Sequence, residues 1–216
     1  MYREVCRALS DKVTVGTVIA AFLENCGVGS AFGVISIHNM PFLDAIGQRA
    51  NIRYVCARGE AGAVNMADGY ARVSGKVGIC EGPSGGGATY IAPGLVEANE
   101  SSIPILAITT DIGVGSRGRY ALTELDQSAL FRPLTKWNGV IERSEDVPKM
   151  LRTAFREMTT GRPGAAHLAL PFDVQNGPVD PADIWHDEDL GRYPAWPTGP
   201  DPVSYTHLRA HETRHD

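Results

Sequence analysis

The stretch Arg58–Arg72, RGEAGAVNMADGYAR, places a single early carboxylate before a run of small and apolar residues. It follows Ile52–Cys56, a β-branched and aromatic segment that favours a strand. The segment Gly59–Ser74 has the composition of a helix, and Gly75 is a typical helix stop. The stretch therefore predicts a strand-to-helix connection with Glu60 in the first turn of the helix.

Predicted strands and helices alternate along the rest of the chain. The other predicted strands are Ser30–Ile35, Val77–Cys80, Pro104–Thr110, Lys136–Ile141 and Ala165–Leu170. The other predicted helices are Val13–Cys26, Asn39–Arg49, Gly87–Ser101, Leu125–Leu134 and Ser144–Thr159. Such alternation indicates an α/β fold in which a parallel β-sheet carries helices on both faces.

The predicted position of Glu60, just beyond a strand, has two explanations. Ligands meet parallel sheets at the carboxyl ends of the strands, so a carboxylate there is suited to contact a ligand. The alternative is structural, because the helix dipole by itself favours an acid in the first turn.

The composition argues against several classes of function. The chain has 216 residues, enough for one sizeable domain, and its formal net charge of −5 argues against a nucleic-acid partner. It contains no apolar run of the roughly 18 residues that a membrane span needs, and it begins without an apolar signal segment. The lack of CxxC spacing predicts reduced thiols in a cytoplasmic protein, rather than disulfides or a zinc site. The four cysteines are Cys6, Cys26, Cys56 and Cys80.

The glycine-rich segment Glu81–Tyr90, EGPSGGGATY, also follows a predicted strand and opens a predicted helix. It lacks the Gly-Lys-Ser/Thr ending of a nucleotide P-loop, and its glycines do not fit G-x-G-x-x-G. A tight turn would explain the glycines. So would a backbone that closely approaches a flat ring or another subunit.

Four segments together carry a family resemblance. They are Phe32-Gly33, Gly59-Glu60 with Ala67–Arg72, Ser84–Thr89, and Thr160–Gly164. From about Thr14 to Gln175 the chain resembles the N-terminal, pyrimidine-binding domain of thiamine diphosphate enzymes of the acetolactate synthase and 2-oxo-acid decarboxylase family. The resemblance implies the thiamine diphosphate-binding fold of that domain. It also implies an enzyme that decarboxylates 2-oxo acids and then carries out a carboligation. Two alternatives stay open: a 2-oxo-acid decarboxylase without FAD, and one half of a split, two-chain thiamine diphosphate enzyme.

The resemblance assigns cofactor contacts to several positions. In the family, the glutamate that matches Glu60 hydrogen-bonds N1′ of the aminopyrimidine, which favours the 4′-imino form that takes the proton from C2 of the thiazolium. The loop residues expected beside the cofactor are Ser84, Gly85, Gly86 and Gly87. Family members that hold FAD contact it through the arginine that matches Arg162, so FAD is a second candidate cofactor. A plain helix-to-strand turn would also explain the segment around Arg162.

Three further positions concern the substrate. Lys136 matches a lysine near the substrate channel of acetolactate synthases, although a solvated lysine would look the same. Where those enzymes carry Pro-Gly-Gly, this chain has the loop Gly33–Asn39, and His38 in it is a candidate proton donor or a solvated histidine. Thr123 replaces the glutamine of their Phe-Gln-Glu motif. In the family both sites help to choose the substrate, so these departures put acetolactate synthesis itself in doubt.

The sequence predicts four regions, one of which is a folded domain. Residues 1–12 are an N-terminal extension, 13–175 the pyrimidine-binding domain, 176–201 a linker toward a missing middle domain, and 202–216 a non-native tail. The tail resembles translated sequencing-adapter text, and the alternative is a metal-binding helix bearing His207, His211 and His215.

The family's magnesium-binding Gly-Asp-Gly motif, with its paired asparagines, is absent from the sequence. We therefore expect Mg²⁺ to be held by a missing C-terminal domain, and no metal ligand in this chain. We also expect the chain alone to be inactive. Its expected partner is a second subunit of a homodimer, or of a homotetramer, that completes a shared active site.

Overall fold

The structure, a computed structural model, describes residues 13–180 and Leu190. The predicted N-terminal extension and the predicted tail lie outside the described residues. The tail's histidines, and with them the alternative of a metal-binding helix, lie outside as well.

Six parallel strands form one sheet in the order β2-β1-β3-β4-β6-β5. The strands are β1 (Ser30–Gly33), β2 (Arg53–Cys56), β3 (Gly78–Gly82), β4 (Ile105–Asp111), β5 (Trp137–Val140) and β6 (Ala166–Pro171). The central strands β3, β4 and β6 are buried along their whole length, which fits a sheet covered on both faces. The predicted parallel α/β fold is therefore confirmed.

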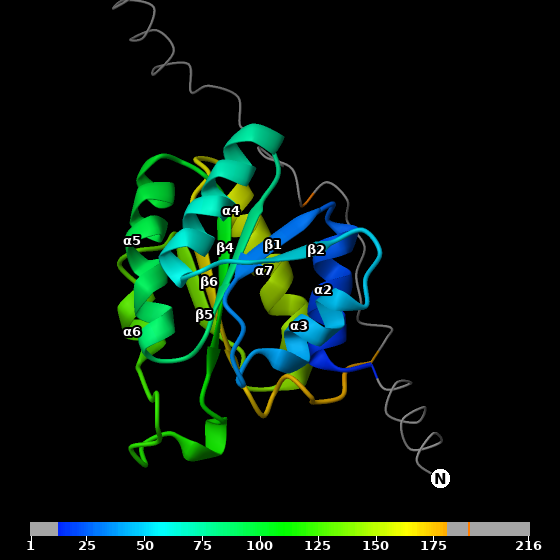
Figure 1. The fold of residues 1–216 in the computed structure, drawn as a ribbon, viewed down its shortest axis with the longest axis vertical. Helices are drawn as coiled ribbons and strands as arrows, with labels where there is room; N and C mark the ends of the chain where they lie inside the picture. Colours follow the sequence, from blue (N-terminus) through cyan, green and yellow to red (C-terminus); the bar gives the residue numbers. More distant parts are fainter. Residues whose placement is uncertain (1–12, 181–189, 191–216) are drawn as a thin grey trace, which may run out of the picture.

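Helices cover the sheet in two layers (Figure 1). The helices are α2 (Val15–Asn25), α3 (Met40–Gly47), α4 (Glu60–Ser74), α5 (Gly86–Glu100), α6 (Gln127–Phe131) and α7 (Val147–Thr159). One hydrophobic cluster holds the apolar faces of α2, α3 and α7, and a second holds those of α4, α5 and α6. Each layer thus buries one face of the sheet.

Local sequence explains where the helices begin, end and approach one another. α2 begins at Thr14, whose hydroxyl accepts a hydrogen bond from the Thr17 N–H at 3.3 Å. α4 ends at Gly75, which adopts the left-handed conformation at φ +67°. In α5, Gly94 lies directly against the Val64 side chain of α4, so the two helices pack closely next to Pro93.

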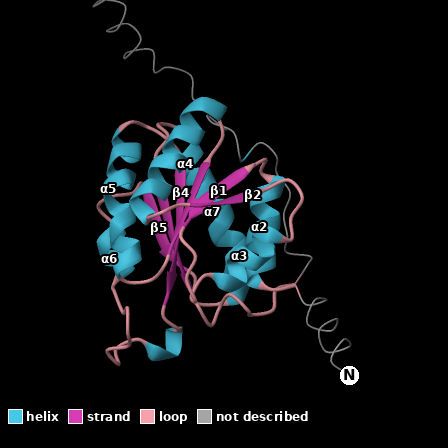
Figure 2. Ribbon diagram, in the orientation of Figure 1, coloured by secondary structure: helices cyan, strands magenta, loops and turns pink. Residues whose placement is uncertain are grey.

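Several predicted elements are shorter in the structure, and two of them have a clear local cause. The strand predicted as Ser30–Ile35 ends at Gly33, because the Asn39 side chain binds the Val34 carbonyl and draws the chain out of the sheet. The helix predicted as Leu125–Leu134 covers only Gln127–Phe131, since Pro133 lies just beyond it. Figure 2 shows that most of the chain between β4 and α6 is loop.

The packed domain extends beyond the boundary predicted after Gln175. Thr14 and Pro178 form an antiparallel bridge, and the Val179 N–H bonds to the Val13 carbonyl at 3.0 Å. Val179 and Leu190 are buried in the core cluster of α2, α3 and α7. Pro178, Val179 and Leu190 therefore pack against the domain, while the rest of the predicted linker lies outside the described residues.

Three of the four cysteines lie in the part of the chain that the structure describes. Cys26 and Cys80 are buried, Cys56 is exposed, and all three thiols are free, while Cys6 lies outside the described residues. Among the described helices, none has both the length and the apolar character to cross a membrane.

A buried polar cluster fixes α6 to the centre of the sheet. The Gln127 side chain donates to the Thr110 carbonyl at 2.7 Å and accepts from the Thr109 hydroxyl. Because that hydroxyl has a single proton, His167 Nε2 must donate to Thr109, 2.6 Å away. The His167 ring stacks on Phe131 with centroids 3.9 Å apart, and burial lowers its pKa to about 3.

We predict that His167 makes stability fall in acid. The folded chain holds a neutral imidazole, whereas an unfolded histidine takes a proton below about pH 6.5. Its contribution is therefore full above pH 6.5 and is lost as the pH falls toward about 3. Relative to His167→Gln, the wild-type chain should lose about 2 kcal/mol of unfolding free energy between pH 7 and pH 5, as measured in urea.

Phe131→Leu is the matched control, because it alters packing on the same ring without changing a titrating group. Its destabilisation should be equal at the two pH values. An identical pH dependence for the wild-type chain and His167→Gln would contradict the prediction.

Candidate active site

Glu60 is the first residue of α4 and lies just beyond the carboxyl end of β2. Its side chain is half-buried, and among the described residues no group donates a hydrogen bond to its carboxylate. Two glycines keep the adjacent space open. A Cβ on Gly87 would lie 3.0 Å from Glu60 Oε1, and one on Gly82 would lie 3.7 Å from Glu60 Cγ. Glu60 thus presents a carboxylate to a space that only glycine leaves free.

The glycine-rich loop curves between β3 and α5. Gly85 adopts φ +64°, and a Cβ on it would lie 2.8 to 3.0 Å from atoms of Thr123. Gly86 has open space around its Cα, whereas a Cβ on Gly87 would meet the Pro83 ring. Gly85 and Gly87 are therefore required by close contacts, while Gly86 is not.

Three predicted site residues form a hydrogen-bonded line along the same edge. His38 Nδ1 lies 2.6 Å from Ser84 Oγ, and Ser84 Oγ lies 2.8 Å from Thr123 Oγ1. These residues follow β1, β3 and β4 in turn, so the line crosses the β1/β3 boundary. The connections leave the sheet in opposite directions there, and ligands bind at such boundaries in parallel sheets.

A residue absent from the predicted site lies under this line. Glu81 of β3 is fully buried, and its Oε1 accepts from Asn39 Nδ2 at 2.5 Å while Tyr54 Oη lies 3.1 Å from its Oε2. Gly33 makes this contact feasible, since a Cβ there would lie 2.5 to 2.6 Å from both Glu81 Oε2 and Tyr54 Oη. The sequence did contain a signal that could have identified Glu81, because this carboxylate directly follows the apolar strand predicted at Val77–Cys80.

The protonation state of Glu81 follows from its surroundings. Burial raises the pKa of the Glu81 carboxyl to about 8, the hydrogen bonds from Asn39 and Tyr54 oppose this rise, and the charge of Glu60 adds to it. At neutral pH Glu81 is therefore mostly protonated. It adds little negative charge beside Glu60.

Arg162 and Lys136 lie at the opposite edge of the sheet. They precede β6 and β5 respectively, so they stand at the amino ends of the parallel strands. Lys136 Nζ donates to the carbonyls of Thr160 and Arg162 at 2.6 and 3.0 Å. The Arg162 guanidinium donates to Ser102 Oγ at 2.8 Å and to the Glu100 carbonyl at 2.5 Å. The structure therefore separates both residues from Glu60.

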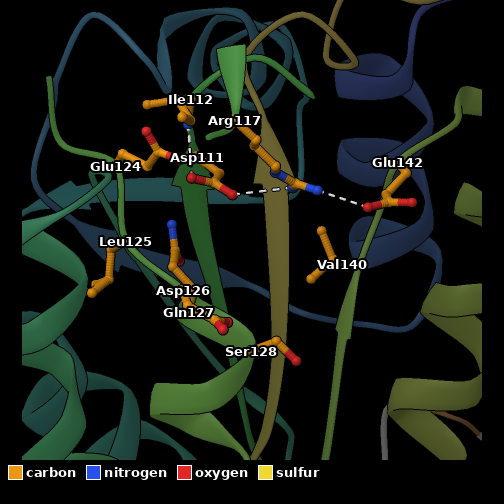
Figure 3. A pocket seen from close by; sticks show the side chains of 10 residues that line it. All are labelled: Asp111, Ile112, Arg117, Glu124, Leu125, Asp126, Gln127, Ser128, Val140 and Glu142. Carbon is orange, nitrogen blue, oxygen red and sulfur yellow. Dashed lines mark hydrogen bonds and ion pairs between the residues drawn. The ribbon is translucent and has the colours of Figure 1, made fainter. Parts of the chain in front are cut away.

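Away from Glu60, a hollow opens where β4 and β5 end (Figure 3). Its volume is about 320 Å³. Arg117 crosses it and pairs with Asp111 at 3.1 Å and with Glu142 at 2.7 Å. Burial raises the pKa of Asp111, although Arg117 and the Ile112 N–H oppose this. The remaining acids of the wall are Glu124 and Asp126. Its one cation is already paired, so this hollow is a poor site for an anion.

The described residues hold no group of three or more His, Cys, Asp or Glu side chains that could bind a metal ion. The donors that do converge at the carboxyl edge are one free carboxylate, two hydroxyls and one imidazole. This set suits hydrogen bonds to a heterocycle and proton transfer rather than metal coordination.

The comparisons with known proteins agree on one family. The model of the thiamine pyrophosphate enzyme N-terminal TPP binding domain matches residues 13–130. The chain is 40% identical to a probable acetolactate synthase large subunit of Methanocaldococcus jannaschii over 158 residues, which cover 73% of this chain and 27% of that protein. It is 35% identical to the acetolactate synthase large subunit of Corynebacterium glutamicum over 203 residues, 94% of this chain and 31% of that protein.

A third relative, the acetolactate synthase large subunit of Lactococcus lactis, is 37% identical over 165 residues, 76% of this chain and 29% of that protein. The chain thus spans less than a third of the length of these relatives. The matched segment contains Glu60, the glycine-rich loop and the His38–Ser84–Thr123 line. The chain belongs to the thiamine pyrophosphate enzymes and carries their N-terminal, cofactor-binding domain.

Proposed function

We propose that this domain supplies the pyrimidine-binding half of an active site that decarboxylates a 2-oxo acid and joins the product to a second carbonyl compound. The observation that carries the proposal is the unpaired Glu60 carboxylate facing the space beside Gly82 and Gly87. The curated relatives are named acetolactate synthases, which supports a 2-oxo acid as substrate.

Glu60 is the proposed catalytic residue. When bound, thiamine diphosphate supplies a thiazolium carbon nucleophile and an electron sink. Glu60 holds a proton at the N1′ position of the pyrimidine, and Gly87 leaves room for the ring beside that carboxyl group. The small neighbours Ala61 and Gly62 add no competing charge. A half-buried setting strengthens such a charge-assisted hydrogen bond.

The His38–Ser84–Thr123 line is the proposed substrate-facing element. An imidazole and two hydroxyls can pass a proton along 2.6 and 2.8 Å contacts. His38 and Thr123 stand where acetolactate synthases carry Pro-Gly-Gly and Phe-Gln-Glu. This difference concerns the choice of substrate and leaves the alternative of a 2-oxo-acid decarboxylase without FAD open.

Other components come from outside the described chain in this proposal. Mg²⁺ and the diphosphate are held by a separate C-terminal domain, or by a separate chain in a split enzyme. A second subunit covers the carboxyl edge, where exposed apolar side chains gather in the loops after β1 and β4. They are Ile35, Ile37, Tyr120 and Leu122. A substrate channel at Lys136 would need a separate interface at the opposite edge of the sheet.

The proposal also includes FAD as a second candidate cofactor and a cytoplasmic location. A flavin that used Arg162 would have to replace the contacts of its guanidinium with Ser102 and Glu100. The free thiols of Cys26, Cys56 and Cys80 support a cytoplasmic location, since oxidising compartments favour disulfides.

The first test of this function is Glu60→Gln in a holoenzyme that contains this domain. The amide keeps the size of the side chain but cannot exchange a proton with N1′. Exchange of the C2 proton of bound cofactor, followed by NMR after quenching, should slow by at least about a hundredfold, with folding unchanged. Wild-type exchange in the variant would remove Glu60 from the mechanism.

The second test compares two neighbouring glycines in this chain. With millimolar thiamine diphosphate and Mg²⁺, amide NMR signals of Glu60 and the Gly85–Gly87 loop should shift. Gly87→Ala should abolish these shifts, because its Cβ would occupy the space beside Glu60 Oε1 and press on Pro83. Gly86→Ala is the matched control, since nothing lies within 4 Å of its Cβ. Equal shifts in both variants would contradict the assigned site.

The third prediction concerns the affinity of the isolated chain. Charge-assisted contacts to the diphosphate and its Mg²⁺ should supply most of the cofactor's binding free energy, and the described residues offer no metal site. Calorimetry should therefore give millimolar or weaker binding, about −4 kcal/mol or less favourable. Micromolar binding would show that this chain contains the diphosphate anchor.

A further inference from the structure

The buried carboxyl group of Glu81 has no cationic partner among the described residues. Its two oxygens are occupied by side chains from different elements, Asn39 before α3 and Tyr54 on β2. A fully buried carboxyl group beside the active site, held only by neutral hydrogen-bonding groups, requires an explanation.

Asn39 links Glu81 to the loop that follows β1. Its Nδ2 donates one proton to Glu81 and the other to the Val34 carbonyl at 2.8 Å, and its Oδ1 accepts from the Ser36 N–H at 2.7 Å. Both protons of the amide are therefore used, which fixes the side chain's orientation. Without Glu81, one of them would be left buried and unpaired.

The loop from Val34 to Asn39 carries His38 to the active-site edge. His38 Nδ1 meets Ser84, and the His38 carbonyl accepts from Gln175 Nε2 at 2.6 Å. Ile35 and Ile37 in the same loop are exposed, while the His38 ring packs edge-on against Phe172 with centroids 5.7 Å apart. The loop is therefore held by the hydrogen bonds of Asn39 and His38 together with this ring contact.

We propose that Glu81 is a positioning residue for this site. Its carboxyl group acts through Asn39 to hold the loop so that the His38 imidazole stays hydrogen-bonded to Ser84. The catalytic consequence rests on the proposed function, because only that function gives the imidazole a substrate. The positioning itself is a property of the chain without cofactor.

Glu81 performs this role as a hydrogen-bond acceptor. Its Oε1 accepts from Asn39 Nδ2, and its Oε2 accepts from Tyr54 Oη. A glutamine keeps the acceptor for Asn39. The titratable groups that face Glu81 are Glu60 at the start of α4, Tyr54 on β2 and Cys80 beside it on β3. Loss of its proton would place a second anion near Glu60.

The test uses the cofactor-free chain labelled with ¹⁵N in its histidine rings. The His38 signals are assigned by their disappearance in His38→Gln, and the Nδ1 shift reports the hydrogen bond to Ser84. At pH 6.5, Glu81→Gln should keep the wild-type Nδ1 shift, whereas Glu81→Leu should lose it. Tyr54→Phe is the matched control: it removes the other hydrogen bond of the same carboxyl and should leave His38 unchanged.

A pH series supplies a second, independent readout. The ionised carboxylate and a glutamine both accept from Asn39, so the wild-type chain and Glu81→Gln should show the same His38–Ser84 signal up to pH 9.5. This comparison needs only the conservative variant, so it holds even where Glu81→Leu fails to fold.

Two results would overturn the proposal. One is an unchanged His38 signal in folded Glu81→Leu. The other is a His38 signal in folded Glu81→Gln that differs from the wild-type signal. Because no thiamine diphosphate is present, neither result bears on cofactor binding, and a failed cofactor experiment leaves this test intact.

Discussion

The hydrogen bond from Asn39 to Glu81, made beside Gly33, is the contact on which the carboxyl edge of the sheet depends. Glu81 lies on β3, next to β1, and a Cβ at Gly33 would lie 2.5 Å from Glu81 Oε2 and displace that carboxyl group. In the space that Gly33 leaves, Glu81 can hold Asn39, and Asn39 can draw the chain out of β1 after Gly33. One missing Cβ therefore sets both the end of a strand and the path of the loop that carries His38.

The sheet's strand order then determines which residues share a site. Residues that follow β1, β3 and β4 converge, because these strands are neighbours and their carboxyl ends lie together. Glu60 reaches the same place from β2 through the first turn of α4. Arg162 and Lys136 belong to the other edge, since they precede their strands. A resemblance in sequence groups all of these positions, but a single parallel sheet cannot bring them together.

The sequence alone was enough to predict every strand, its parallel direction and the position of Glu60 just beyond β2. Alternating apolar segments and glycine stops carry that information locally. The contacts of His38 with Ser84 and of Asn39 with Glu81 join residues more than forty positions apart, so they depend on strand order. Glu81 was also placed outside its strand, because a carboxylate is an unfavourable choice for a buried position unless a network accommodates it.

Electrostatics explains why that network is made of neutral groups. An arginine or lysine paired with Glu81 would keep it ionised, and the site would then hold two buried or half-buried carboxylates. Their repulsion would compete with any partner that Glu60 binds. An amide and a phenol satisfy the same oxygens without adding a cation, and burial keeps the proton on Glu81. Among the described residues beside the glycine-rich loop, this leaves Glu60 as the carboxylate that would exchange a proton with the ligand in the proposed function.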